Sequence, residues 1–374
     1  TYSNGLPATW WGMMGAPLGL FIALTGFVVY RFRETRALTL AQFFEMRYSR
    51  SFRFFSGALC WISGILNFGI FPAVTTRFII YFFGFPESFL FFGLSIPLFP
   101  VIMFLYLSIA LYIACAGGQI CIMLTDFFQG MLLLNIFLLI MFYLLIQFNW
   151  YDIMAGLSFA PENKSLINPF HTSQASDFNI WYFLIGLIGA VYGVRAWQGN
   201  SGYNSSAKTP HEAVMAGIIS SWRTQASSLC MLLLPLTAYA VLHSESFAEL
   251  AAPIQAQLDM ITDPAVKSQM TVPLFLSHLL PVGMLGLFAV VIIACAISCD
   301  DTYMHAWGTI LIQDVVMPLR KKPFAPKQHI KILRFSIVGV AFFSFIFSLL
   351  FPLKDYIYMY FAMTGAIYLG GAGS

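Results

Sequence analysis

Long uninterrupted runs of apolar residues dominate this chain. Polar and charged stretches divide them into nine segments, at about 8–30, 54–83, 89–116, 119–148, 179–198, 213–242, 279–316, 332–353 and 356–373. A helix needs about 20 apolar residues to cross about 30 Å of hydrocarbon. A membrane β-barrel would instead show ten-residue stretches of alternating apolar and polar residues. The pattern therefore predicts an all-α polytopic membrane protein with about nine transmembrane helices.

Composition agrees with this class. Hydrophobic residues make up 59% of the 374 residues and charged residues only 9%, against about 25% charged residues in soluble domains. The net charge of +3 is gathered in particular loops, so nothing indicates a nucleic-acid partner. No coenzyme or phosphate-binding motif is present, and no enzyme activity is expected. The six cysteines all lie in apolar segments, and none forms a CxxC pair. This pattern is typical of small buried residues and not of disulfides or metal ligands.

The basic residues of the loops predict an orientation. Two loops are rich in them, after the first segment (Arg31, Arg33, Arg36, Arg47, Arg50, Arg53) and after the seventh (Arg320, Lys321, Lys322, Lys327, Lys331). The alternate loops, at 149–178 and 243–272, hold only Lys164 and Lys267. Because basic loops stay cytoplasmic, the first segment is expected to run from outside to inside. A chain that starts outside without a signal sequence is expected to be an internal piece of a longer protein, truncated at both ends.

The seventh segment carries the most unusual chemistry, in the stretch from Ala294 to His305. Asp300 and Asp301 lie in an apolar run, where an ionised aspartate costs about 2.5–3.5 kcal/mol at the centre of a membrane helix. Four polar residues share one helical face, at spacing i, i+3, i+4 and i+7: Ser298, Asp301, Thr302 and His305. Hydroxyl and carboxylate oxygens suit a hard cation such as sodium. The alternative is a helix end whose aspartates are wetted by the cytoplasm.

Three stretches together resemble the sodium:solute symporter family, which includes the sodium/glucose, sodium/proline and sodium/pantothenate cotransporters. The first, 39–48, reads TLAQFFEMRY and is similar to a cytoplasmic loop of the family. The second is Gly117-Gly118 followed by Thr125-Asp126-Phe127-Phe128-Gln129, similar to the start of a core helix. The third is the stretch around Asp300 and Asp301, running on to Gln313-Asp314. Their order, spacing and sidedness agree with the family across nearly the whole chain.

The resemblance implies a leucine-transporter-type helical bundle of two inverted five-helix repeats, with the binding site near the membrane midplane. The chain would form a single transporter domain over 1–374. Core helices two to five would fall at about 8–148 and core helices six to ten at about 179–373. Core helix one, which supplies backbone carbonyls to the family's sodium site, would lie outside this sequence.

The resemblance also assigns a cation site. Counting back from Asp314, the family's ligands on core helix eight fall on Cys295 (backbone carbonyl), Ser298 (hydroxyl) and Cys299. Cys299 departs from the usual hydroxyl, and a thiol is a poor sodium ligand. Either the site is lost, or a carboxylate replaces the missing hydroxyl. Asp301, with Thr302 on the same face, is the better candidate for this replacement, so that sodium is the only metal and Ser298 and Asp301 bind it. Asp126 matches an aspartate near the ion exit or a second cation site; alternatively, its charge favours a helix N-terminus.

The substrate site is expected on core helix six. The resemblance points there to the aromatic and amide residues Tyr192, Trp197 and Gln198, and the chemistry of the segment adds Arg195. An arginine inside an apolar segment is a functional candidate. Arg195 could bind a substrate carboxylate with two hydrogen bonds, or pair with Asp300 or Asp301 without touching substrate. The aromatic residues have an alternative interpretation as membrane-interface residues.

These observations predict a sodium-coupled secondary active symporter that moves a small polar organic solute inward by alternating access. Its partners would be the solute, sodium as the coupling ion and the lipid bilayer, with no cofactor and no nucleic acid. It would be a multi-pass protein of a bacterial-type plasma (inner) membrane, with an oligomeric state that the sequence leaves open. The alternatives are proton coupling, in which Asp301 and His305 titrate, cation-independent transport, and a membrane sensor built on a transporter fold.

Overall fold

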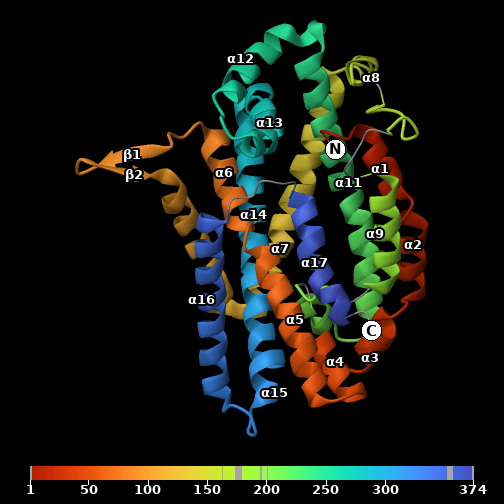
Figure 1. Cartoon of the computed structure of the whole chain (residues 1–374), viewed down its shortest axis with the longest axis vertical. Coiled ribbons are helices and arrows are strands. Elements are labelled where there is room, and N and C mark those ends of the chain that lie inside the picture. Colours follow the sequence, from red (N-terminus) through yellow and green to blue (C-terminus); the bar gives the residue numbers. More distant parts are fainter. Residues whose placement is uncertain are drawn as a thin grey trace. The chain divides into compact units, whose positions relative to one another are not determined.

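The computed structural model describes residues 2–161, 163–172, 179–193, 196–199, 201–351 and 357–372 (Figure 1). These residues are almost entirely helical. The exception is an antiparallel hairpin of β1 (Ser88–Phe91) and β2 (Leu94–Pro97), in which Ser88 pairs with Pro97. The all-α class predicted from the sequence is thus confirmed for the described residues.

Among the described residues, five helical stretches are long and apolar enough to cross a membrane: Gly5–Glu34, Arg50–Phe83, Leu98–Gln147, Val282–Leu319 and Pro326–Leu350. Two helices bent by 94° at their junction, Ser227–His243 and Glu245–Asp259, give a sixth if they count as one broken span. Shorter apolar helices cover Ile180–Val191 and Ile357–Leu369. Each of the nine expected segments overlaps one of these helices, and the third and fourth segments both overlap Leu98–Gln147.

Helix α7 (Leu98–Gln147) contains the third and fourth expected segments. It is broken at Gly118, whose φ of 57° and ψ of −152° are not helical and are open essentially to glycine alone. The third segment was expected to begin at 89, which is wrong: the hairpin occupies Ser88–Pro97 and α7 begins at Leu98. The apolar run continues through the hairpin, so hydrophobicity does not mark the boundary. The turn depends on Phe92 and Gly93, both with positive φ.

The chain divides into two compact units. Unit 1 comprises 1–25, 131–192 and 216–291, and contains the later parts of α7 and α11 (Pro210–His243) and the beginning of α14 (Val282–Ile310). Its other elements are α1 (Gly5–Met13), α2 (Ala16–Thr25), α8 (Trp150–Leu157), α9 (Ile180–Tyr192), η1 (Glu245–Phe247), α12 (Ala248–Asp259) and α13 (Pro264–Leu279).

Packing inside unit 1 is close at α8 and α11. A Cβ placed on Gly156 would lie 2.6 Å from the Cβ of Ala240, so only glycine allows these helices to approach so closely. The rings of Phe137 and Phe288 stack with centroids 6.5 Å apart.

Helix α13 was not expected, because most of it lies in the polar loop assigned to 243–272. Its N-cap Asp263 accepts hydrogen bonds from Ala265 N and Val266 N, a common start signal for a helix.

Unit 2 comprises 26–130, 193–215 and 292–374. Besides the hairpin and its parts of α7, α11 and α14, it contains α3 (Val29–Glu34), α4 (Leu40–Arg47), α5 (Arg50–Phe68), α6 (Phe71–Phe83), α10 (Ser201–Ser206), η2 (Leu311–Val316), α15 (Met317–Leu319), α16 (Pro326–Leu350) and α17 (Ile357–Ala372). Thr39 and Ser49 cap α4 and α5 through their hydroxyl groups. Helix α17 lies beside α5 (Figure 1), joined by hydrogen bonds from Ser63 and Asn67 to Thr364.

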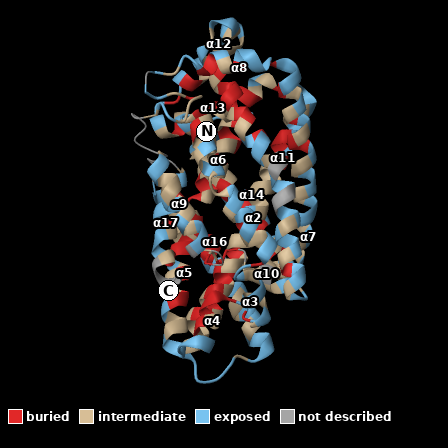
Figure 2. Ribbon diagram, turned by 90° about the vertical axis from the view of Figure 1, so that its right-hand side faces the viewer, coloured by how far each residue is buried: buried red, intermediate tan, exposed pale blue. Residues whose placement is uncertain are grey.

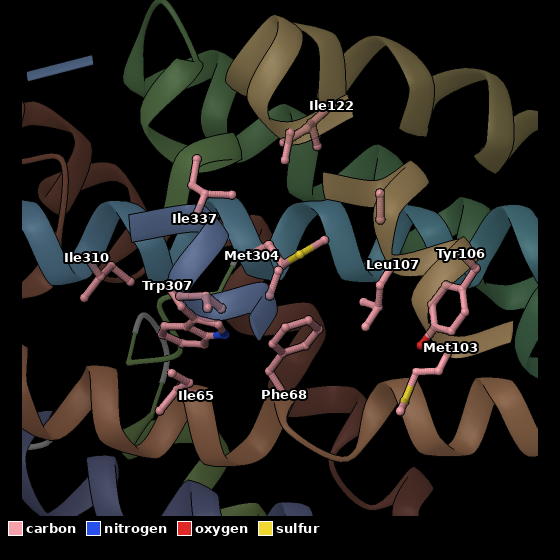
Figure 3. Packing of buried hydrophobic residues seen from close by; sticks show 14 residues of the cluster. Ile65, Phe68, Met103, Tyr106, Leu107, Ile122, Met304, Trp307, Ile310 and Ile337 are labelled. Carbon is pink, nitrogen blue, oxygen red and sulfur yellow. The ribbon is translucent and has the colours of Figure 1, made fainter. Parts of the chain in front are cut away.

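The core of unit 2 is built around Trp307 of α14, which is 1% exposed (Figure 3). Ile65 and Phe68 of α5 face its ring, and Met304 lies one turn away. A Cβ on Gly64 would come within 2.3 Å of the Trp307 ring, so this glycine admits the indole against the α5 backbone. The core therefore fixes the part of α14 that carries the unusual polar residues.

Large apolar side chains remain exposed along the long helices, and exposed residues run along α7 (Figure 2). Ile120 and Ile146 of α7 are 83% and 82% exposed. A soluble protein rarely leaves apolar surface of this extent in water, whereas lipid tails solvate it without penalty. The exposed faces are therefore those of an integral membrane protein.

Candidate cation site

Asp126 of α7 gathers hydroxyl groups from two other elements of unit 2. Ser298 Oγ donates to Asp126 Oδ1 at 2.5 Å, and Thr302 Oγ1 donates to Asp126 Oδ2 at 3.3 Å. Tyr203 of α10 also donates its hydroxyl to Asp126 Oδ2, and its oxygen lies 2.9 Å from Thr302 Oγ1. One carboxylate and three hydroxyl groups from three helices thus meet at one place. We call these four residues the Asp126 cluster.

The local sequence explains how two of these side chains reach Asp126. Ser298 and Thr302 are four residues apart on α14, so both lie on the same helical face. Asp126 follows the break at Gly118 by two turns of α7. The sequence singled out these three residues but missed Tyr203, because α10 is a six-residue helix in a polar stretch that no periodic pattern marks.

Asp301 lies beside the Asp126 cluster and is fully buried. Its Oδ1 is 3.4 Å from Thr302 Oγ1, while its Oδ2 is buried without a hydrogen-bond partner among the described residues. His305 is half-buried, and its Nε2 lies 3.9 Å from the position that a Cβ on Gly118 would take. The His305 side chain thus lies near the break in α7.

Asp300 is 1% exposed, and neither of its carboxylate oxygens has a hydrogen-bond partner in the described part of the chain. The nearby Tyr106 hydroxyl is likewise buried and unpartnered there. The wetted helix end considered as an alternative is therefore wrong for both aspartates, since Asp300 and Asp301 are enclosed by protein. Cys295 is half-buried and Cys299 is exposed, and their part in cation binding stays a prediction.

The residues expected to bind substrate fall partly outside the described chain. Arg195 lies outside the described residues, and Tyr192 ends α9 with a side chain that is not described. Trp197 packs edge-on against Trp307, with ring centroids 5.2 Å apart. Gln198 is 5% exposed, and its Oε1 accepts a hydrogen bond from Leu40 N at 3.0 Å. Gln198 therefore caps the start of α4, and its role toward a solute stays a prediction.

A second buried polar network joins two of the three motif stretches. Asp314 Oδ1 accepts hydrogen bonds from Thr39 Oγ1 at 2.9 Å and from Arg53 Nε at 3.1 Å. Arg53 also bonds Glu45 Oε2 at 2.5 Å and the Gln313 carbonyl at 2.8 Å. Asp314 is 1% exposed, and a Cβ on Gly57 would lie 2.6 Å from its Cβ. Hydrogen bonds thus join the 39–48 stretch, which contains α4, to η2, which directly follows α14.

The chemistry of the Asp126 cluster is that of a hard-cation site. All its groups are oxygens, the donors that sodium and similar ions prefer. Among the described residues, no three histidine, cysteine, aspartate or glutamate side chains gather as they would around a tightly held transition metal. Long apolar helices around a half-buried group of oxygen donors are typical of a membrane transporter that is coupled to a cation.

The family follows from comparison with known proteins. The model of the sodium:solute symporter family matches residues 1–370, so the chain belongs to this family. It is accordingly a multi-pass membrane transporter and not an enzyme. No curated protein matches the chain.

A solved structure shares the fold. It is described as the substrate-bound outward-open state of a Na+-coupled sialic acid symporter that reveals a novel Na+ site. The match has a TM-score of 0.68 and 17% sequence identity, and covers 99% of this chain and 75% of that chain. At this identity the likeness concerns the fold alone. The symporter fold expected from the sequence motifs is confirmed.

Proposed function

We propose that this protein couples the entry of Na+ to the inward movement of a small polar organic solute across a bacterial-type plasma membrane. Asp126, Ser298, Thr302 and Asp301 bind the ion in this proposal. The observation that carries it is the convergence of Ser298 and Thr302 of α14 on the Asp126 carboxylate of α7.

The donor set supports Na+ over softer or more highly charged ions. The three hydroxyl groups now donate to Asp126, so their oxygen lone pairs stay free to coordinate a cation. Asp301 Oδ2, buried and without a partner among the described residues, adds a carboxylate oxygen at the edge of the cluster. A cation there would offset the cost of two nearby carboxylates in a poorly polar surrounding. Cys299 then needs no role as a ligand.

Ion binding can drive transport because the ligands lie on different helices. An ion held between α7, α14 and α10 favours the arrangement of helices in which these groups are close. Differential affinity of this kind shifts the population between outward-facing and inward-facing states. The solute would contact Tyr192, Arg195, Trp197 and Gln198, with Arg195 the candidate for a carboxylate group on the solute.

The test is binding of 22Na+ to the purified full-length protein in detergent, measured by scintillation proximity. We expect Asp126→Asn to weaken 22Na+ binding at least tenfold, because the amide keeps the shape but removes the charge that attracts the ion. Asp152→Asn is the matched control, since Asp152 is an exposed residue in the first turn of α8. An Asp126→Asn protein that binds 22Na+ like the wild type would exclude the cluster as the sodium site.

A further inference from the structure

One end of unit 2 carries a concentration of positive charge that ion coupling does not use. Residues 315–351 contain six basic residues and no acidic residue: Arg320, Lys321, Lys322, Lys327, Lys331 and Arg334. Among the described residues, none of the six forms an ion pair with a carboxylate. All six are exposed. The charge is therefore available to an anionic partner.

Contacts with α5 hold the loop at the start of this region in place. Arg50 donates to the Met317 carbonyl at 3.2 Å and to the Arg320 carbonyl. The Arg320 guanidinium lies 4.0 Å from the centre of the Phe324 ring, and its Nε donates to the Lys322 carbonyl at 3.3 Å. These bonds fix the backbone that leads into α16, so the basic residues of α16 have a defined position.

One face of α16 changes from basic to apolar along its length. Lys327, Lys331 and Arg334 follow one another at i, i+4 and i+7, so they share this face. The same face continues with three large apolar residues that are 66%, 44% and 66% exposed: Phe335, Val338 and Phe342. Lys331 Nζ lies 5.9 Å from the Phe335 ring centre, at the point where the basic part meets the apolar part. We call these six residues the α16 stripe.

The two halves of the α16 stripe match the two halves of a phospholipid. Clustered cations at the end of a transmembrane helix attract anionic headgroups. Exposed aromatic and aliphatic side chains in the adjoining helical turns can pack against acyl chains. A free phosphate ion could use only the basic half. The loop leading into α16 is predicted to be cytoplasmic, and anionic lipids give the cytoplasmic leaflet its negative surface potential.

We propose that the α16 stripe is a binding site for one anionic phospholipid. Its phosphate lies among Lys327, Lys331 and Arg334, and its acyl chain lies along Phe335, Val338 and Phe342. The site is separate from the Asp126 cluster and does not depend on sodium coupling. It holds a lipid against unit 2 at the helix that packs on α6.

Lipid binding can be measured on the full-length protein in detergent by native mass spectrometry, with added phosphatidylglycerol or phosphatidylcholine. We expect wild-type protein to prefer phosphatidylglycerol at least tenfold. The triple variant Lys327→Gln, Lys331→Gln, Arg334→Gln should lower this preference to about threefold or less. The control Lys164→Gln, Lys208→Gln, Lys267→Gln removes the same number of positive charges from other parts of the chain and should keep the wild-type preference.

Two further measurements distinguish a bound phospholipid from a free phosphate ion and from a general effect of positive charge. Inorganic phosphate at millimolar concentration should not displace phosphatidylglycerol, whereas displacement would assign a free-phosphate site and overturn the proposal. The double variant Phe335→Ser, Phe342→Ser should weaken phosphatidylglycerol binding at least threefold. Its 22Na+ binding should stay unchanged, and this unchanged binding also shows that the variant is folded. Equal loss of lipid preference in the control and the stripe variant would overturn the proposal as well.

Discussion

At the scale of single residues, the two adjacent aspartates of α14 have different surroundings. Asp301 lies beside Thr302 at the edge of the Asp126 cluster, whereas both Asp300 oxygens are buried without a partner in the described chain. Helical spacing predicted this divergence, since consecutive residues point about 100° apart on a helix. It could not predict what each would face, because that depends on which helices pack against α14.

We expect Asp300→Asn to raise the thermal stability of the purified protein, by about 1–3 kcal/mol, because it removes a buried carboxyl group that has no hydrogen-bond partner among the described residues. Thermal unfolding in detergent, followed by size-exclusion chromatography, measures the change. Asp301→Asn is the comparison: it should remove stabilisation by added Na+, while Asp300→Asn should keep it. A lower unfolding temperature for Asp300→Asn would contradict the prediction.

At the scale of elements, the buried network around Asp314 ties α4 and α5 to η2, the short helix that directly follows α14. Thr39 of the family-like loop and Asp314 are 275 positions apart in the chain, yet they share a hydrogen bond. The sequence indicated that both stretches are distinctive. Only the folded chain shows that they form one network, because contact between distant stretches leaves no periodic signal.

Breaking this network should be costly. Arg53→Gln should destabilise the protein by about 3–5 kcal/mol, because it leaves the buried Asp314 carboxylate without its cation. Asp314→Asn should cost less, because Arg53 keeps its pair with Glu45. The side chains of Arg53 and Asp314 are only 13% and 2% exposed. The double variant should lose less unfolding free energy than the two single variants lose in sum. A double-mutant cycle, followed by thermal unfolding, measures this difference.

The exposed pair of Arg31 and Glu34 provides the control for that cycle, with side chains 85% and 41% exposed. Exposed pairs contribute about 0–1 kcal/mol, so Glu34→Gln should have little effect. Strict additivity of the Arg53 and Asp314 variants would show that the two groups do not interact.

The break in α7 depends on a single backbone position. Gly118 has a φ of 57° and a ψ of −152°, so Gly118→Ala should destabilise the protein by about 1–3 kcal/mol through backbone strain alone. No side chain would collide, since the nearest atom to an added Cβ is 3.9 Å away.

Gly186→Ala is the matched control for Gly118. Gly186 lies inside α9 with nothing within 4 Å of an added Cβ, and alanine favours a helix by about 1 kcal/mol over glycine. We expect this variant to be neutral or slightly more stable in the same thermal assay. Equal behaviour of the two variants would mean that the α7 backbone is not strained at Gly118.

At the scale of the whole molecule, the membrane decides which residues can be exposed. Apolar side chains such as Ile120 and Ile146 point outward because lipid replaces water around them. The interior in turn holds carboxylates and hydroxyls, which in a membrane protein mark the path of an ion or solute. The chain also divides into two compact units whose boundaries fall inside α7, α11 and α14. The hydrophobic pattern contains no sign of that division, because the helices continue through it.

By itself, the sequence determined the class, the positions of the apolar helices, the family and the shared face of Ser298, Asp301 and Thr302. Each of these follows from local composition, from helical periodicity or from motifs read along the chain. The tertiary structure alone decided that Asp126 and Tyr203 meet that face, that Gln198 bonds Leu40 N, and that Arg53 pairs with Asp314. These contacts join residues far apart in the chain, and packing around Trp307 and Gly64 brings the helices that carry them together.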